Sequence, residues 1–267
     1  MSRVILFRSS PFQHEHVLRA LSLSSEVVDV HDRRDLGLSR VTLDGVEVTV
    51  RNQPMHQFSH ALLLGQPSPS PLSVAASRLD PTEREFEANE WAAGLSSALL
   101  LSRVKLFNRG AVSGAAASLS TKPGQVAFLA KLGWRTPSLR LTRTGVGEEI
   151  RSYGCDLGTL RKLFLCISKR YELVYPPGEA WDAFSTRELE ATRRTQESLS
   201  SLQLDWLTIS LAISAERVFA FGATTELPPE LGDGGMAAIF SSCLCAPATD
   251  PPPRTNAALN GGGKACS

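Results

Sequence analysis

The 267-residue sequence lacks most features that would assign a function by themselves. Its formal net charge is +1, so it has no excess of positive charge for binding nucleic acid or an acidic membrane surface. No apolar run approaches membrane-spanning length, and the N-terminal residues lack the charged-then-apolar profile of a signal peptide. We therefore expect a cytoplasmic protein that binds neither nucleic acid nor membranes. Its oligomeric state is not indicated.

Signatures of common catalytic and metal sites are also missing. The five cysteines are odd in number and scattered, which argues against a disulfide framework. No Gly-x-Ser-x-Gly motif occurs, and every histidine precedes residue 61, which leaves a serine-hydrolase triad without support. His14, His16, His56 and His60 could form a metal cluster, but no carboxylate or cysteine set completes a tetrahedral site. Solvated or core histidines are the favoured interpretation.

The composition is that of an ordinary globular protein. Hydrophobic residues make up 42% of the chain and charged residues 21%, so the chain can bury a real core in one large or two modest domains. The N-terminal part alternates strands with one helix: we expect strands at 3–9, 25–32 and 60–66, a helix at 14–22, and a hairpin at 41–50. This order predicts a small doubly wound α/β domain.

A long helix is predicted to follow a proline-rich loop. Asp80 can cap it, Pro81 suits its first turn, and the helical pattern then continues to residue 102. Its apolar residues fall roughly on one face, which we expect to pack in the core: Phe86, Trp91, Leu95, Leu99 and Leu100.

The central segment 106–142 has the most complete set of signals for where helices and strands begin and end. A strand at 103–108 is followed by a helix at 122–132, which either Ser120 or Thr121 can cap. Pro123 lies early in this helix and Gly133 just beyond its end. A further strand is expected at 138–142.

The C-terminal part gives weaker signals. We expect a strand at 161–170, an exposed helix at 185–204, and two paired strands at 206–213 and 217–223. The exposed helix opens with Ser185 and Glu188 at capping-box spacing. From residue 246 onward the chain is rich in proline, glycine and small residues, which predicts disorder.

Two lysines are candidates for binding an anion. Lys122 opens a predicted helix, where its ammonium and the free backbone N–H groups could together hold a phosphate. Lys169 ends an apolar strand, a position that could fix a charge against a ligand. Both also fit surface lysines that flank regular elements, and the residues alone leave these alternatives open.

The central segment resembles the one that joins the pre-grasp domain to the ATP-grasp core in the RimK-like and graspetide-ligase branches of the ATP-grasp family. The matching residues occur in the family's order: Asn108, Lys122, Gln125, Leu132, Gly133, Thr136, Pro137 and Thr142. Upstream, residues 83–91 resemble the helix that the family places before this segment. The resemblance covers residues 1 to about 145, and the ordered set carries it rather than any single motif.

The resemblance implies ATP and magnesium as cofactors and a reaction that joins a carboxylate to an amine through an acyl-phosphate. Lys122 matches the family's first nucleotide-contacting lysine, and Lys169 could match the second. Such chemistry needs positive charge on the phosphates and magnesium held by oxygen ligands.

The C-terminal half departs from the family's metal site. Ser210 and Gly222 stand where the resemblance expects acidic residues, and Thr224 stands where it expects an asparagine. Asp205 and Glu226 lie nearby and are the candidate substitutes as magnesium ligands, although neither is in register. The chain between Lys169 and Asp205 also looks too short for the lobe that closes on ATP.

We therefore expect an α/β fold in which an N-terminal doubly wound pre-grasp domain, residues 1–105, precedes a reduced ATP-grasp-like α+β domain, residues 106–245, and a disordered tail, residues 246–267. The favoured function is that of a degenerate accessory module that binds a peptide or a protein partner, with no catalytic residue. The alternative is an active ATP-dependent carboxylate–amine ligase.

Overall fold

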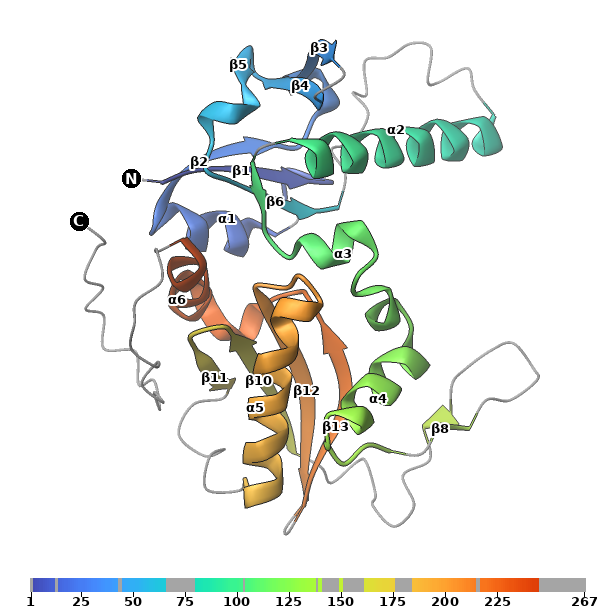
Figure 1. Cartoon of the computed structure of the whole chain (residues 1–267), viewed down its shortest axis with the longest axis vertical. Coiled ribbons are helices and arrows are strands. Elements are labelled where there is room, and N and C mark those ends of the chain that lie inside the picture. Colours follow the sequence, from blue (N-terminus) through green and yellow to red (C-terminus); the bar gives the residue numbers. More distant parts are fainter. Residues whose placement is uncertain are drawn as a thin grey trace. The chain divides into compact units, whose positions relative to one another are not determined.

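The computed structural model describes residues 2–12, 14–42, 45–65, 80–102, 104–137, 139–140, 149–150, 161–175, 184–214 and 217–244 (Figure 1). The chain divides into two compact units, and the division lies between Ser113 and Gly114. The predicted tail at residues 246–267 lies outside the described residues. In the described part, no helix is both long and apolar enough to cross a membrane.

The N-terminal unit is built on a four-stranded parallel sheet in the order β2-β1-β6-β7. Its strands are β1 (Ser2–Arg8), β2 (Ser25–Val30), β6 (His60–Leu64) and β7 (Lys105–Leu106). The strand order reverses at β1, as predicted for a doubly wound unit. Because β1 is central and covered on both faces, its apolar run from Val4 to Phe7 is fully buried.

Helices and a small second sheet complete this unit. The helices are α1 (Glu15–Ser22), α2 (Pro81–Leu101) and α3 (Arg109–Ser113), with short 3-10 turns η1 (Arg33–Asp35) and η2 (Met55–Gln57). The second sheet is antiparallel and contains β3 (Leu36–Thr42), β4 (Gly45–Val50) and β5 (Gln53–Pro54). The predicted hairpin is therefore confirmed by the pairing of β3 with β4, although residues 43 and 44 of its turn are outside the described residues.

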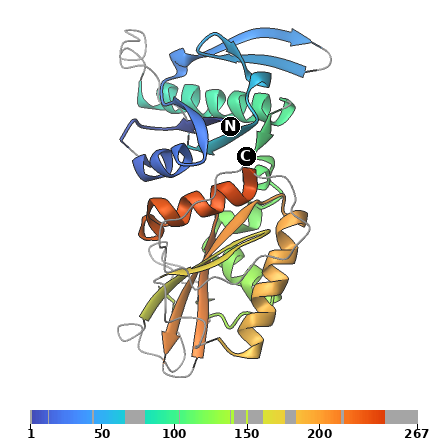
Figure 2. The ribbon, with the colours of Figure 1, turned by 90° about the vertical axis from the view of Figure 1, so that its left-hand side faces the viewer.

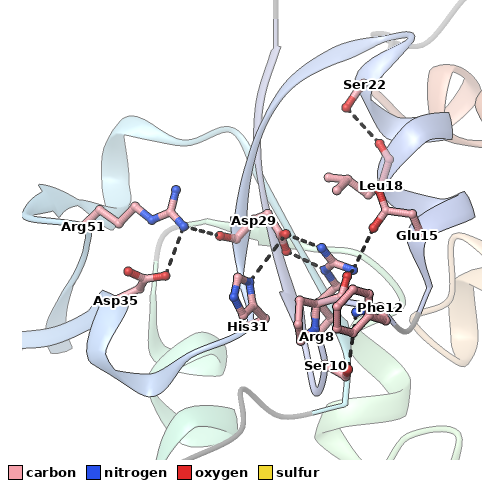
Figure 3. A network of polar contacts seen from close by, with 11 residues as sticks. Arg8, Ser10, Phe12, Glu15, Leu18, Ser22, Asp29, His31, Asp35 and Arg51 are labelled. Atoms are coloured by element: carbon pink, nitrogen blue, oxygen red, sulfur yellow. Dashed lines mark hydrogen bonds and ion pairs between the residues drawn. The ribbon is translucent and has the colours of Figure 1, made fainter. Parts of the chain in front are cut away.

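A buried arginine fixes the loop between β1 and α1 (Figure 3). Arg8 is 3% exposed, and its Nε donates to Asp29 Oδ1 at 2.7 Å while Nη2 pairs with the other carboxylate oxygen. Nη1 donates to the Pro11 carbonyl and lies 3.2 Å from Glu15 Oε2. The bonds to Asp29 raise the pKa of Arg8, so the guanidinium stays charged inside this unit.

One predicted contact of α2 is wrong. Leu95 and Leu99 are buried and Trp91 is half-buried, but Phe86 is 66% exposed. Leu95 lies nine positions after Phe86, which is about two and a half helical turns, so the two side chains lie on opposite sides of the helix.

The C-terminal unit is built on a four-stranded antiparallel sheet in the order β11-β10-β12-β13. Its strands are β10 (Arg161–Ser168), β11 (Glu172–Tyr175), β12 (Trp206–Ser214) and β13 (Arg217–Thr224). Other elements are η3 (Ala117–Ser120), α4 (Lys122–Lys131), α5 (Thr186–Ser201), η6 (Pro229–Leu231), α6 (Gly232–Leu244), and the short pair β8 (Leu139–Arg140) and β9 (Glu149–Ile150). The expected pairing of the two C-terminal strands is confirmed.

Local capping fixes where three helices begin, as the sequence predicted. Asp80 forms a capping box at the start of α2, and Ser185 forms one with Glu188 at the start of α5. Of the two candidate caps of α4, Thr121 is the one used, since its hydroxyl accepts the N–H of Gly124 at 3.3 Å. Each cap satisfies backbone donors that the first helical turn leaves without partners.

The prediction that α5 is an exposed helix is wrong. One face is fully buried against the sheet, and its residues include Ala191, Thr192 and Thr195. The threonine hydroxyls donate to carbonyls one turn earlier, at 2.8 Å for Thr192 and 2.7 Å for Thr195. Thr195 also accepts the indole N–H of Trp134 at 3.0 Å. Polar side chains thus form a buried face because their hydrogen bonds are satisfied within the protein.

The helix α6 was not predicted from the sequence. Its Phe240 packs edge-on against Trp206 of β12, with ring centroids 5.6 Å apart, and Ser242 lies 3.3 Å from Ser168 of β10. Neighbouring residues of a strand point to opposite faces, so α6 packs on one face of the sheet while α5 packs with Leu207 and Ile209 on the other (Figure 2).

The start of α4 has no room for a side chain at Gly124, which gives a test of the fold. A Cβ atom at this position would overlap the carbonyl oxygen of Ser118. We expect Gly124→Ala to lower the free energy of unfolding by about 1–3 kcal/mol, because backbone cannot yield as a side chain can. Thermal and denaturant unfolding would measure the loss.

The control for this test is Gly94→Ala in α2, where an added Cβ would meet nothing within 4 Å. It should raise stability by about 0.5–1 kcal/mol, since glycine is unfavourable inside a helix. Equal effects of the two substitutions would contradict the described packing of α4.

Candidate functional site

A β-bulge in the edge strand β13 sets the geometry of the candidate site. Ser210 of β12 pairs with Gly222 of β13, but the next residue, Leu211, pairs with Ala220. Phe221 is therefore the extra residue on β13, where it bends the strand. Ser210 and Gly222 are cross-strand partners and direct their side-chain positions to the same face of the sheet.

The ammonium of Lys122 lies directly at this pair. Lys122 is the first residue of α4, which runs beside β13 (Figure 1). Its Nζ is 3.0 Å from where a Cβ of Gly222 would stand, and Ser210 Cβ is 3.7 Å from the same point. Nζ also lies 5.4 Å from the centroid of the Phe221 ring, within cation–π range.

Gln125 holds α4 against the bulged strand. Its Nε2 donates to the carbonyl of Leu119 at 2.9 Å, and its Oε1 accepts the backbone N–H of Ala223 at 3.4 Å. On the same edge, the N–H of Ala220 donates to the carbonyl of Arg135 at 2.8 Å. The outer edge of β13 is thus partnered on both sides of the bulge, which fixes the position of Lys122.

In the part of the chain that the structure describes, the site offers hydrogen-bond donors, and no carboxylate pairs with its ammonium. Within the described residues, Lys122 Nζ has neither an ion pair nor a hydrogen bond, and the same holds for the hydroxyl of Ser210. Thr224, two residues beyond Gly222, already uses its hydroxyl to accept the N–H of Glu226 at 3.2 Å. A half-buried ammonium without a carboxylate is chemically suited to an anion.

The other predicted site residues lie at a different part of the sheet. Lys169 is exposed and directly follows β10, whose last residue pairs with Trp206. Asp205 directly precedes Trp206 and is buried, and Glu226 is exposed just beyond the end of β13. These three residues share one end of the sheet, and Asp205 lies five residues, or about 17 Å along the strand direction, from Ser210.

Magnesium does not fit the residues beside Lys122. Ser210 supplies one hydroxyl and Gly222 supplies no side chain, whereas magnesium is held by carboxylates. Across the described residues, no group of three or more His, Cys, Asp and Glu side chains could hold a metal. His14, His16, His56 and His60 therefore form no such cluster among the described residues. The role of Asp205 and Glu226 as magnesium ligands stays a prediction.

The thiol of Cys166 is not available as a nucleophile at neutral pH. Cys166 of β10 is completely buried, and burial raises the pKa of its thiol to about 12. Only the thiolate is nucleophilic, so this cysteine is part of the core.

Sequence reasoning missed the role of Phe221 and the contact between Lys122 and Gly222. The available signal was the glycine inside an otherwise apolar strand, which often marks a bulge or a close approach. The sequence does show Gly222, but it does not show that a lysine one hundred positions earlier occupies the space.

The bridge made by Gln125 gives a test of the site's architecture. Gln125→Ala removes both of its hydrogen bonds, and we expect the free energy of unfolding to fall by about 1–3 kcal/mol. Hydrogen exchange at the Ala223 amide should become faster, because this edge N–H loses its acceptor.

Gln125→Glu is the matched control, since it keeps an oxygen for Ala223 and loses only the donor to Leu119. Protection of the Ala223 amide should be retained in this variant. Unchanged exchange in the alanine variant would show that Gln125 does not fix the edge of β13.

Comparison with known proteins identifies the fold of the chain. No family model matches the sequence, and no characterised protein matches it in a sequence search. The macrocyclase MdnC from Microcystis aeruginosa, bound with the precursor peptide MdnA, is similar in structure with a TM-score of 0.59 and 10% identity over 90% of this chain and 98% of that chain. An ATP-grasp ligase from Chryseobacterium gregarium, in complex with ADP and a leader and core peptide, has a TM-score of 0.58 and 11% identity over 92% and 98%.

A third similar structure is the ATP-grasp ligase PsnB with a minimal precursor, magnesium and ADP. It has a TM-score of 0.60 and 12% identity, and the match covers 90% of this chain and 97% of that chain. At such low identity the similarity establishes the fold alone. The chain therefore has the fold of the ATP-grasp ligases, which confirms the resemblance predicted from its sequence.

Proposed function

We propose that this chain is an ATP-grasp-like protein that binds a peptide or a partner protein as an accessory module and does not catalyse ligation. The supporting observation is the pair formed by Ser210 and Gly222. Beside a half-buried lysine ammonium, this pair supplies a hydroxyl and a position without a side chain, where the family resemblance leads us to expect carboxylates.

The peptide part of the proposal is supported by the similar structures. MdnC, the Chryseobacterium gregarium ligase and PsnB were each solved with a precursor or with leader and core peptides. The same fold in this chain supports a peptide ligand. The fold does not itself transfer their activity, since function depends on the residues of the site.

The second candidate is an active ligase with Lys122 and Lys169 on phosphate and Asp205 and Glu226 on magnesium. It is favoured by one observation, that Lys169, Asp205 and Glu226 share one end of the sheet.

The test is nucleotide turnover in the presence of an acceptor that traps any acyl-phosphate. The protein would be incubated with Mg-ATP, hydroxylamine, and a pool of synthetic peptides that contain Asp, Glu, Lys and Thr. We expect ADP release no higher than that of Lys122→Met, and we expect affinity selection with mass spectrometry to recover peptides that are unmodified.

Magnesium-dependent ADP release with hydroxamate on a peptide would establish the ligase instead. In that case, Asp205→Asn combined with Glu226→Gln should abolish the release, because it removes both candidate metal ligands. Glu230→Gln, in the exposed η6 turn, is the control for an unspecific loss of negative charge.

A further inference from the structure

We infer that the C-terminal unit binds a phosphate-bearing anion at Ser210 and Gly222 without a divalent metal, and that the ammonium of Lys122 takes the place of the metal charge. The inference deepens the proposed function, on which it rests, by naming the ligand class of its degenerate site.

The first observation is that the described residues give the site hydrogen-bond donors and no charged acceptor. Lys122 can donate three hydrogen bonds and Ser210 one, and neither uses a donor within the described part of the chain. Gln125 Oε1 is 3.4 Å from the Cβ position of Gly222, but it already accepts the N–H of Ala223. The unfilled hydrogen-bonding capacity therefore calls for oxygen acceptors with negative charge.

The second observation is that Gly222 provides the space for the ammonium. A Cβ at this position would stand 3.0 Å from Lys122 Nζ, closer than carbon and nitrogen normally approach. A side chain there would require the ammonium to shift by a few tenths of an ångström, and a carboxylate there would neutralise its charge. Gly222 therefore has no side chain that could bind a metal, and the ammonium of Lys122 lies beside the space that this leaves.

The third observation is that the surroundings of the ammonium leave its positive charge available to an anion. The face of Phe221 lies 5.4 Å from Nζ, and its ring attracts a cation without neutralising it. Lys122 also stands at the N-terminus of the ten-residue helix α4, whose partial positive charge adds to its own. Both effects are available to an incoming anion.

A divalent cation is disfavoured at this position for the same reasons. It would have to lie beside a positive ammonium, with one serine hydroxyl and no carboxylate as protein ligands. A phosphate group has several charged oxygens that can satisfy Lys122 and Ser210 together, which a single carboxylate does less completely. Phosphate is therefore the ligand chemistry that the site fits.

The experiment is isothermal titration of the full chain with pyrophosphate and, separately, with ADP, each in EDTA and in excess magnesium. We expect binding in EDTA that is equal to or tighter than in magnesium, because magnesium competes with Lys122 for the phosphate oxygens. Pyrophosphate binding alone would identify a free phosphate ligand, and tighter binding of ADP would identify a nucleotide. Both results support the inference.

Three variants test the assigned residues. Lys122→Met should weaken binding in EDTA at least about tenfold, as expected for loss of a charge-assisted hydrogen bond. Gly222→Glu should weaken it as strongly, whereas Gly222→Gln, with the same size and no charge, should retain more of the affinity. Lys131→Met, at the other end of α4, is the control and should leave binding unchanged.

The circular dichroism and melting temperature of each variant would show that it is folded. The inference is overturned by binding that requires magnesium, by no binding of either probe at millimolar concentration, or by an unchanged affinity in Lys122→Met. Binding that requires magnesium without turnover would overturn this inference and leave the proposed function intact. Turnover would overturn the proposed function whatever the affinity in EDTA.

Discussion

The absence of a side chain at Gly222 is the constraint on which the charge arrangement of the C-terminal unit depends. It allows the ammonium of Lys122 to lie 3.0 Å from the vacant Cβ position, across the edge of β13. Gln125 holds that edge from α4, and the bulge at Phe221 supplies an aromatic face for the ammonium. Together these features produce a positive site, and within the described residues its ammonium has no counter-ion.

The fold and the chemistry of this chain are separable. The chain has the fold of ATP-grasp ligases at 10–12% identity to the three structures, over 90–92% of its length. Such a fold is maintained by burial, which many apolar sequences satisfy, and ligase chemistry needs a few particular oxygen ligands. A chain can lose such ligands and keep its core, and the proposed function assigns that loss to the cross-strand pair of Ser210 and Gly222.

Local signals made much of the fold predictable, and the site was less so. The caps at Asp80, Thr121 and Ser185 could be read because their partners lie within a few residues. The buried face of α5 was missed because it contains hydroxylated residues, and α6 because glycines dominate its first turn. The contact between Lys122 and Gly222 depends on strand register and on α4 reaching a strand far along the chain, which no local pattern encodes.

The central claim is that Lys122 is the cation of a metal-free phosphate site, and the lysine side chain can be observed directly. The chain has only six lysines, so their Nζ and Cε resonances can be resolved by NMR, and Lys122→Met would assign the relevant signal. On titration with pyrophosphate in EDTA, the account predicts that the Lys122 resonance shifts while that of Lys169 stays in place. A shift that occurs only with magnesium, or at Lys169 alone, would contradict it.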